Sequence, residues 1–456
     1  METAETRGGF SSRLGFILAT AGAAVGLGNL WRFPYLAEEY GGGIFLLVYL
    51  ILVVTFGVAM LITELAIGRR TGKSCFDALM DLCGKHPVIG WVATLVPLII
   101  VPYYCVIGGW VTKYFADYAV GSGSDLATDG FFSAFSSMSL DGLFDSPVPW
   151  FLIYAGLTIL VVVFGVEKGI ERISKILMPA LFVILIAICV YMLTLPGISE
   201  GLSYYLTPDF DKLSFKTIAG AMGQLFYSLS IAMGITIAYG SYMRKQENIE
   251  KSAYTIALTD TSVAFLAGLM VVPAVIVFGG GNITSGPGLM FQTMPLVFDT
   301  MPAGDAVGAA FFLLTLFAAL TSSIALMEAV VSVLRDRWHI PRVRACAIVG
   351  ILIIALGMLS CLGYGPLDAI QPLGMAFLDF FDFITNSVMM PLVALITCVL
   401  IGYVVKTRYV VEEVESSGCE FRTKSLYHVM VRYVCPVFMV LILAVGVAGA
   451  FGIYTI

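Results

Sequence analysis

Long apolar runs follow one another along almost the whole chain. Each is about 20 residues or longer, which matches a hydrocarbon core of roughly 30 Å at 1.5 Å of helical rise per residue. The runs lack the alternation of outer-membrane strands, and backbone groups in lipid need partners within the protein. The pattern therefore predicts an all-α, polytopic membrane protein. Its eleven expected helices span residues 12–36, 42–68, 88–116, 148–166, 172–196, 215–243, 250–279, 304–336, 343–363, 374–405 and 428–452.

The composition agrees with this class and argues against several others. Hydrophobic residues make up 59% of the chain and charged residues 12%, against roughly 25% charged residues in a typical soluble domain. The nine cysteines have no paired spacing, so neither a disulfide framework nor a zinc site is expected. The chain has three histidines and no common hydrolase or metalloprotease motif, and its basic residues form no patch for nucleic acid beyond the loops.

Lys and Arg are concentrated in alternate loops. Residues 114–149, 279–303 and 362–372 contain none, and Lys212 and Lys216 are the exceptions on that side. The positive-inside rule therefore predicts an inside N-terminus in the plasma (cytoplasmic) membrane, and eleven spans put the C-terminus outside. The basic residues of the expected inside loops are Arg69, Arg70, Lys73, Lys85, Lys168, Arg172, Lys175, Arg244, Lys245, Lys251, Arg335, Arg337, Arg342, Arg344, Lys406, Arg408, Arg422 and Lys424.

The first apolar run contains an unusual concentration of glycine and polar residues at mid-depth. Gly22, Gly26 and Gly28 are followed by Asn29 and Arg32. A helix-interior glycine costs about 1 kcal/mol relative to alanine, so it needs a packing or functional reason. Close helix packing explains the first two glycines but not Asn29 and Arg32, so a break in this helix is expected.

A matching disturbance occurs in the sixth run, where Gln224, Ser228 and Ser230 precede Gly234. Broken helices five spans apart are typical of transporters with inverted repeats and a binding site near the midplane. Exposed backbone groups at such breaks suit an anion at one end and a cation at the other.

Few other polar residues lie inside the apolar runs, so each is a functional candidate. Asp260 lies in the seventh run, and Asp379 and Asp382 lie near the start of the tenth. Carboxylate, hydroxyl and carbonyl oxygens suit an alkali cation. For Thr321, Ser322 and Ser323 in the eighth run, hydrogen bonding to the preceding helical turn is an equally simple explanation.

Four segments resemble the neurotransmitter:sodium symporter family. They read RLGFILATAGAAVGLGNLWRFPYLAEEYGGGIF, GQLFYSLSIAMG, SGPGLMFQTMPLVF and LTSSIALME, and the resemblance covers essentially the whole chain. It implies a fold of two five-helix inverted halves, with helices 1 and 6 unwound at mid-membrane. The halves would be residues 1–196 and 215–405, followed by a cytoplasmic loop and an eleventh helix at 406–456.

The resemblance also implies two sodium sites and no organic cofactor. One site would take carbonyls of Gly22, Val25 and Ala318 with the hydroxyls of Thr321 and Ser322. The other would take the Ala24 carbonyl, Asn29, Ser228, Asp260 and an oxygen of the substrate. Because substrate and ion would share an oxygen, each would bind better in the presence of the other.

The same resemblance implies a site for an amino acid. Its carboxylate would meet amides near Gly26 and Gly28 and the Tyr104 hydroxyl, and Gly26 stands where monoamine members have an Asp. A mostly apolar lining favours a hydrophobic or aromatic side chain. The implied substrate-binding residues are Ala23, Ala24, Gly26, Gly28, Ile100, Tyr104, Tyr227, Ser228, Ser230, Met233, Ser322 and Leu326.

Two gates complete the implied site. The outer gate would pair Arg32 with Asp382, supported by Gln224. The inner gate would pair Arg7 with Asp336, beside Tyr242 and Glu328. Ordinary interfacial charges are the simpler alternative for both pairs, since exposed ion pairs contribute only about 0–1 kcal/mol.

Two departures from animal members suggest independence of chloride. Asp260 stands where those members have Asn beside a chloride site, and Ala264 replaces a chloride-binding Ser. A fixed carboxylate would supply the missing negative charge. The chain also ends after the eleventh run, so a dimer contact made by a twelfth helix is not implied and the oligomeric state stays open.

Together these features predict sodium-coupled symport of an amino acid into the cell by alternating access. Besides sodium, the expected partners are this small molecule and the lipid bilayer. A ligand-gated or leak cation channel is the main alternative, because oxygen-lined sites also form selectivity filters. A membrane-embedded enzyme is a weaker one.

Overall fold

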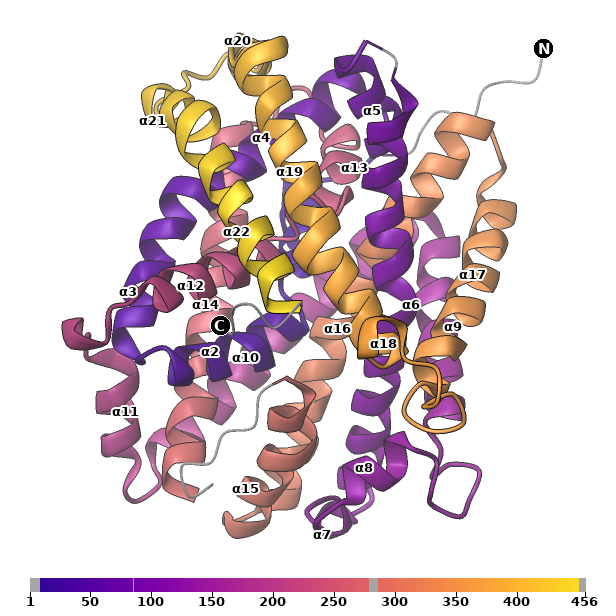
Figure 1. Cartoon of the computed structure of the whole chain (residues 1–456), viewed down its shortest axis with the longest axis vertical. Helices are drawn as coiled ribbons and strands as arrows, with labels where there is room; N and C mark the ends of the chain where they lie inside the picture. Colours follow the sequence, from indigo (N-terminus) through magenta and orange to yellow (C-terminus); the bar gives the residue numbers. More distant parts are fainter. Residues whose placement is uncertain (1–8, 85, 279–285, 451–456) are drawn as a thin grey trace.

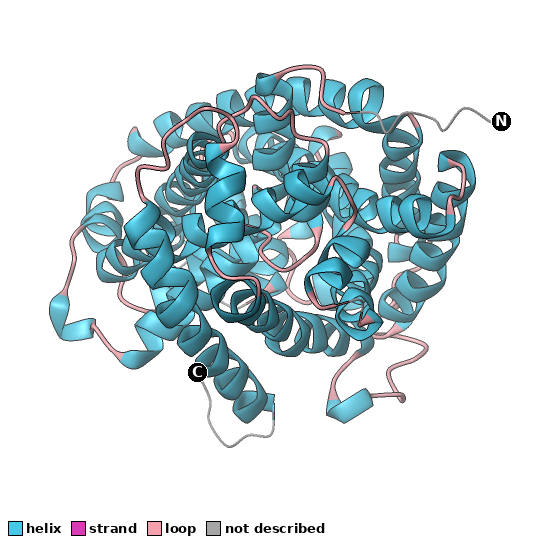
Figure 2. Ribbon diagram, turned by 90° about the horizontal axis from the view of Figure 1, so that it is seen from above, coloured by secondary structure: helices cyan, strands magenta, loops and turns pink. Residues whose placement is uncertain are grey.

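The computed structural model describes residues 9–84, 86–278 and 286–450. Apart from an isolated β-bridge between Gly42 and Pro208, the ordered elements among these residues are helices joined by turns and loops (Figure 2). The predicted all-helical class is confirmed.

The first five expected segments are all helical (Figure 1). Their bounds are α1 Arg13–Ala24, the π-helical turn Gly28–Arg32 and α2 Phe33–Glu39; α3 Gly43–Leu52, the π-helical turn Val53–Gly57 and α4 Val58–Thr71; α6 Pro87–Ala119; α9 Pro147–Val163; and the π-helical turn Val166–Glu171 with α10 Arg172–Leu193.

The six later segments are helical as well. Their bounds are α12 Phe215–Ser228 and α13 Ile235–Ser241; α14 Ile249–Phe278; α16 Gly304–Trp338; α17 Arg342–Leu362; α18 Phe377–Asp382, the π-helical turn Phe383–Met389, α19 Met390–Val399 and a second such turn, Leu400–Val404; and α21 Lys424–Val429, the π-helical turn Met430–Val434 and α22 Cys435–Ala450.

Short helices connect these segments. They are α5 Cys75–Leu82, α7 Gly123–Leu126, α8 Phe131–Ser136, α11 Ile198–Leu206, the 3₁₀ turn Phe210–Lys212, the π-helical turn Leu289–Thr293, α15 Met294–Thr300, the 3₁₀ turn Pro372–Gly374 and α20 Arg408–Glu415.

Length and composition alone identify fewer spans than the eleven expected. The described residues contain eight helices that are long and apolar enough to cross a membrane, or nine if α1 and the bent continuation Gly28–Glu39 count as one. The fourth segment, α9, is apolar but shorter, and the sixth is divided into α12 and α13. The chain is a polytopic helical protein, while the count of eleven and the two five-helix halves stay predictions.

The first and sixth segments are interrupted where the glycine and polar residues predicted it. The helix axis bends by 54° between α1 and Gly28–Glu39. In the sixth segment α12 ends at Ser228, and Gly234, with a φ of 71°, precedes α13. A left-handed backbone suits glycine, so this position is a natural restart for the helix.

Glycine also lets α13 lie directly against α4. A Cβ on Gly68 would stand 2.0 Å from the carbonyl oxygen of Ile237 and 2.9 Å from the amide nitrogen of Ser241. On the opposite side, a Cβ on Gly240 would stand 2.6 Å from the carbonyl oxygen of Leu65. This backbone-to-backbone packing fixes the position of the second half of the broken helix.

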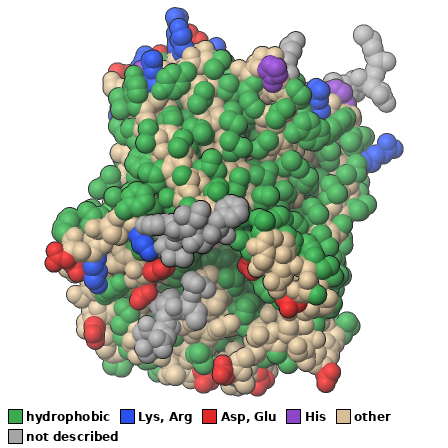
Figure 3. Space-filling view, viewed as in Figure 1, with side chains coloured by type: hydrophobic (Ala, Val, Ile, Leu, Met, Phe, Trp, Pro, Cys, Tyr) green, Lys and Arg blue, Asp and Glu red, His purple; other side chains and the backbone are tan. Residues whose placement is uncertain are grey.

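Charged side chains separate toward the two ends of the molecule. Most of the Lys and Arg visible in Figure 3 lie at the end that carries α5 and α20, and Asp and Glu predominate at the opposite end. A broad apolar band lies between them. The distribution suits a membrane-spanning protein, while the inside and outside assignment stays a prediction.

We expect Gly68→Ala to destabilise the protein, because its new Cβ would meet backbone atoms that cannot rotate away. Overpacking of this kind costs about 1–3 kcal/mol. Gly156→Ala is the matched control: Gly156 lies in α9, is exposed, and a Cβ there meets no atom within 4 Å. Thermal unfolding in detergent should give a lower midpoint for Gly68→Ala alone; equal midpoints would contradict this packing.

Candidate functional site

The two helix breaks lie against each other in the middle of the bundle. The Ser230 hydroxyl donates to the Ala23 carbonyl at 3.1 Å, and the Gln224 amide donates to the Gly28 carbonyl at 2.8 Å. All four residues lie at or beside a break. Backbone groups released by one broken helix are thus partly satisfied by side chains of the other.

The second break contains strained backbone that a buried carboxylate supports. Ser230 and Ala232 have φ values of 53° and 62°, which non-glycine residues seldom adopt. Glu64 of α4 accepts from the Ala232 amide at 2.8 Å and from the Thr236 hydroxyl. Glu64 was not among the predicted site residues. Its position inside an apolar run, the criterion that identified Asp260, would have found it.

All twelve residues implied for substrate binding line one cavity between the breaks. Its free volume is about 20 Å³, and Leu27 and Ile235 line it as well. This volume is room for about one water molecule, so an amino acid requires the lining to move apart. The structure therefore has this cavity in a closed form.

The closed cavity leaves little room for a side chain on Gly26 at its polar end. A Cβ on Gly26 would lie 2.7 Å from the Ser322 hydroxyl and 2.8 Å from the Tyr104 hydroxyl. The Leu27 amide donates to that same Tyr104 hydroxyl at 3.2 Å. A backbone amide and a phenol thus converge where a carboxylate could accept from both.

The residues of the first expected sodium site also meet. The Ser322 hydroxyl lies 3.4 Å from the Gly22 carbonyl oxygen, 3.1 Å from that of Val25 and 3.2 Å from that of Ala318. It lies 3.2 Å from a fourth carbonyl, that of Ala23. A hydroxyl has one proton, so it can donate to one of these oxygens at a time.

The Thr321 hydroxyl, 3.0 Å from the Ala318 carbonyl, adds another oxygen to this group. These oxygens outnumber the protons available to hydrogen-bond with them. Uncharged oxygen ligands grouped in this way are the kind that a hard cation prefers. The residues present therefore fit a sodium ion.

Three of the four protein residues of the second expected sodium site form a tight polar cluster. The Asn29 amide nitrogen lies 2.7 Å from Asp260 Oδ1 and 3.0 Å from Ser228 Oγ, while Ser228 Oγ lies 2.8 Å from Asp260 Oδ2. Asp260 is fully buried, and neutral groups supply these hydrogen bonds. The fourth member, Ala24, lines the adjacent cavity.

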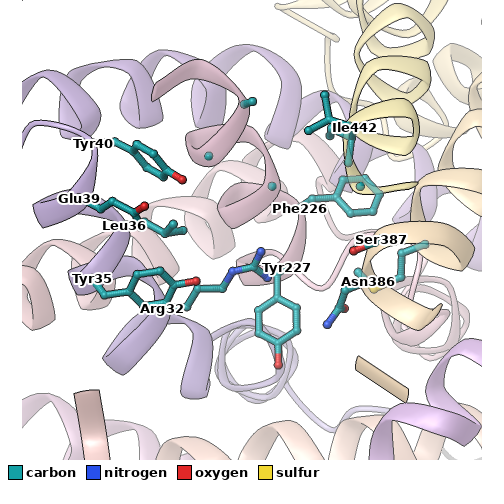
Figure 4. Close-up of a pocket in the computed structure, with 16 residues that line it drawn as sticks. Arg32, Tyr35, Leu36, Glu39, Tyr40, Phe226, Tyr227, Asn386, Ser387 and Ile442 are labelled. Carbon is teal, nitrogen blue, oxygen red and sulfur yellow. The ribbon is translucent and has the colours of Figure 1, made fainter. Parts of the chain in front are cut away.

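Tyr227 lines both the closed cavity and a wider one of about 380 Å³, whose lining is shown in Figure 4. The Arg32 guanidinium carbon stands 5.4 Å from the centre of the Tyr227 ring. Asp382 accepts from Tyr103 at 3.0 Å and from Asn386 at 2.5 Å. Arg32 and Asp382 are near enough to interact electrostatically but form no direct ion pair.

At the other end of the site an ion pair between a buried carboxylate and a partly buried guanidinium closes the bundle. Arg342 binds Glu328 through two contacts of 2.6 Å and 3.2 Å, and Tyr242 donates to Glu328 at 2.8 Å. Asp336 accepts from the Ser74 amide at 2.7 Å. Arg7, the expected partner of Asp336, lies outside the described residues.

Sequence reasoning did not predict a role for Arg342 in the site, because it identified this residue only as one of the basic residues in the loops. It also missed Glu171, which accepts from the Ser11 amide at 2.6 Å, the Ser11 hydroxyl at 2.7 Å and the Ser12 hydroxyl at 2.9 Å. This carboxylate holds the segment before α1 against the start of α10. Its position at the edge of an apolar run was the available signal.

Known proteins with this sequence pattern are membrane transporters. The Sodium:neurotransmitter symporter family matches residues 7–121 and 128–451. An uncharacterized sodium-dependent transporter of Bacillus subtilis, YhdH, is 33% identical over 95% of this chain and 96% of its own length. An uncharacterized sodium-dependent transporter of Haemophilus influenzae is 33% identical over the same shares of the two chains.

A solved structure agrees with these sequence matches. MhsT in complex with L-phenylalanine superposes with a TM-score of 0.85 at 36% identity, covering 96% of this chain and 99% of that one. The two chains therefore share a fold. This chain belongs to the sodium:neurotransmitter symporter family and is a multi-pass membrane transporter, not an enzyme.

Proposed function

We propose that this transporter carries a hydrophobic or aromatic L-amino acid into the cell together with sodium, by alternating access and without need of chloride. The observation that carries the proposal is the closed cavity between the two helix breaks. Its polar end lies beside two oxygen-rich clusters and its other walls are mostly apolar.

The cavity suits an amino acid that has an apolar side chain. The Leu27 amide and the Tyr104 hydroxyl are placed for a carboxylate, and Gly26 leaves the space that this group needs. Ile100, Met233 and Leu326 belong to the lining, and methionine adapts its shape to bulky ligands. MhsT, which shares the fold, has been solved with L-phenylalanine.

Sodium fits the two oxygen clusters for different reasons. Around Ser322, four carbonyl oxygens compete for one proton. Around Asp260, a buried carboxylate accepts only from neutral groups, an arrangement that a nearby cation would stabilise. A substrate carboxylate that joined the second cluster would couple the two binding equilibria.

Independence of chloride follows from the same carboxylate. Asp260 supplies a fixed negative charge beside Ser228, so a dissolved anion is not needed to balance a bound sodium ion. The Gln224 side-chain carbonyl oxygen is buried and has no hydrogen-bond partner among the described residues, so a water molecule could join it.

We expect purified protein to bind L-phenylalanine more tightly in sodium than in potassium or choline, because the proposed coupling joins substrate binding to sodium binding at these clusters. Scintillation proximity with labelled amino acid would measure this. In liposomes, a sodium gradient should drive accumulation above equilibrium, with equal uptake in chloride and gluconate.

If no proteinogenic amino acid binds more tightly in sodium than in potassium or choline, sodium coupling is contradicted. Sodium current without accumulation would instead indicate a channel. Uptake that collapses in gluconate would contradict only independence of chloride.

We expect Asp260→Asn to weaken sodium-dependent binding at least about tenfold, or ~1.4 kcal/mol, because the fixed negative charge is lost. Chloride should partly restore binding. The sodium midpoint in the same proximity assay measures the change, and Asp211→Asn, at an exposed position in the 3₁₀ turn Phe210–Lys212, is the control. An unchanged midpoint in Asp260→Asn would contradict the role given to Asp260.

Ser322→Ala and Ser323→Ala make a matched test of the first sodium site. Ser322 faces four carbonyls beside the first break, whereas the Ser323 hydroxyl contacts Tyr154 and Thr158 away from it. We expect Ser322→Ala to raise the sodium midpoint several-fold and Ser323→Ala to leave it near the wild-type value. Equal effects would indicate general destabilisation instead of a lost ligand.

A further inference from the structure

Another cavity, lined by polar groups and separate from the substrate site, lies at the end of the molecule that carries α7 and α15 (Figure 1). Its volume is about 150 Å³, and we call it the acidic cavity. Three elements form it: the end of α6 with α7, the end of α15, and the start of α16. Its lining residues are Tyr118, Gly123, Ser124, Phe298, Asp299, Met301, Gly304 and Asp305.

Two carboxylates of the acidic cavity have no counter-charge. Asp299 and Asp305 form no ion pair or hydrogen bond with another described residue, and no Lys or Arg lines the cavity. Residues 114–149 and 279–303, the loops that supply much of its wall, contain no basic residue at all. Nothing in the surrounding sequence therefore neutralises these charges.

The helix ends beside the cavity explain one carboxylate but not the other. Asp305 lies in the first turn of α16, where the helix dipole favours negative charge. Asp299 lies in the last turn of α15, where the same effect disfavours it. The helix dipole therefore gives no reason for an acidic residue at Asp299.

An unpartnered hydroxyl provides the independent observation. The Tyr118 side chain is only 4% exposed, and its hydroxyl has no hydrogen-bond partner among the described residues. It is near enough to Asp305 and Asp299 to feel both charges. A buried hydroxyl without a partner is unfavourable, so it marks a place where a ligand is missing or exchanges with water.

The Tyr118 ring cannot turn this hydroxyl elsewhere. It stacks on Phe312 at 5.6 Å and meets the edge of Phe298 at 6.0 Å. Gly123 and Gly308 contact it so closely that a Cβ on either would stand 2.4 Å from ring atom Cε1. The Cβ on Gly123 would also stand 2.2 Å from Asp305 Oδ1, so this carboxylate lies beside the same edge of the ring.

We propose that the acidic cavity binds a hard divalent cation of the calcium type, held by Asp299, Asp305 and the Tyr118 hydroxyl. All candidate ligands are oxygens, and the Ser124 side chain adds another at the rim. The described residues contain no group of three or more His, Cys, Asp and Glu that could hold a metal ion, so a tight site for any metal, calcium included, is not expected here. Two carboxylates suit a weak calcium site of about 0.1–1 mM.

Such an ion would join three elements that otherwise meet through apolar contacts. It would link the end of α6, the end of α15 and the start of α16, so its binding should stabilise this end of the molecule. The proposal concerns a site separate from the transport cavity and does not depend on the proposed substrate.

Radiolabelled calcium binding to purified protein, at constant sodium and ionic strength, tests the proposal. We expect one saturable site near millimolar calcium and a rise of several degrees in the thermal unfolding midpoint. The double variant Asp299→Asn, Asp305→Asn should raise the calcium midpoint more than tenfold. Tyr118→Phe, which keeps the ring packing, should raise it several-fold.

Asp125→Asn is the matched control, because Asp125 lies on α7 and is exposed but does not line the cavity. Unfolding midpoints without calcium identify any variant that is simply misfolded. The proposal is overturned if wild-type protein binds no calcium up to 10-fold above the expected midpoint. An unchanged midpoint in the double variant or in Tyr118→Phe, or an equal loss in Asp125→Asn, overturns it too.

Discussion

Two helices of this bundle are interrupted at mid-depth, and the backbone groups that each interruption releases must find partners inside the protein. In lipid no water is available to bind them, so an unsatisfied amide or carbonyl costs several kcal/mol. The Gly26 amide donates to Asn29 and the Leu27 amide to Tyr104. The Ala232 amide donates to Glu64.

The side chains that accept these backbone hydrogen bonds come from different helices. Tyr104 belongs to α6 and Glu64 to α4, so the need to satisfy the breaks fixes α4 and α6 around them. The glycine contact between α4 and α13 acts in the same direction. The side chains that hydrogen-bond the free backbone groups at the breaks therefore also fix the helices that surround the cavity.

The site residues that could be predicted from the sequence are polar residues that stand in apolar runs. Asn29, Arg32 and Asp260 stand out because a polar side chain in an apolar run is unfavourable without a reason. Resemblance to a family then assigned their neighbours, and those neighbours line one cavity. Glu64 met the same criterion and was overlooked.

What could not be predicted is which partner each group takes. Glu328 pairs with Arg342, across the end of α16 and a turn, and nothing in the spacing distinguishes Arg342 from the other basic residues nearby. The sequence likewise cannot show whether Arg32 and Asp382 lie close enough for a direct ion pair, and in the structure they form none. Tyr103 and Asn386 hold Asp382, while Arg32 lies over Tyr227.

The two ends of the transport site are closed by contacts of unequal strength. Toward the wider cavity of about 380 Å³, an aromatic ring and a nearby guanidinium border the site. Toward the other end, the buried Glu328 and the partly buried Arg342 form a two-contact ion pair, and Glu171 holds the segment before α1. Separating these charges is unfavourable unless water solvates them.

Alternating access requires both open states to lie within a few kcal/mol of each other. In the proposed cycle, movement of Tyr227 therefore opens one side at small expense in free energy. Opening the other side must hydrate Glu328, Arg342 and Glu171 as they separate. Since water can then solvate these charges, hydration lowers the free energy needed to break the contacts at this end.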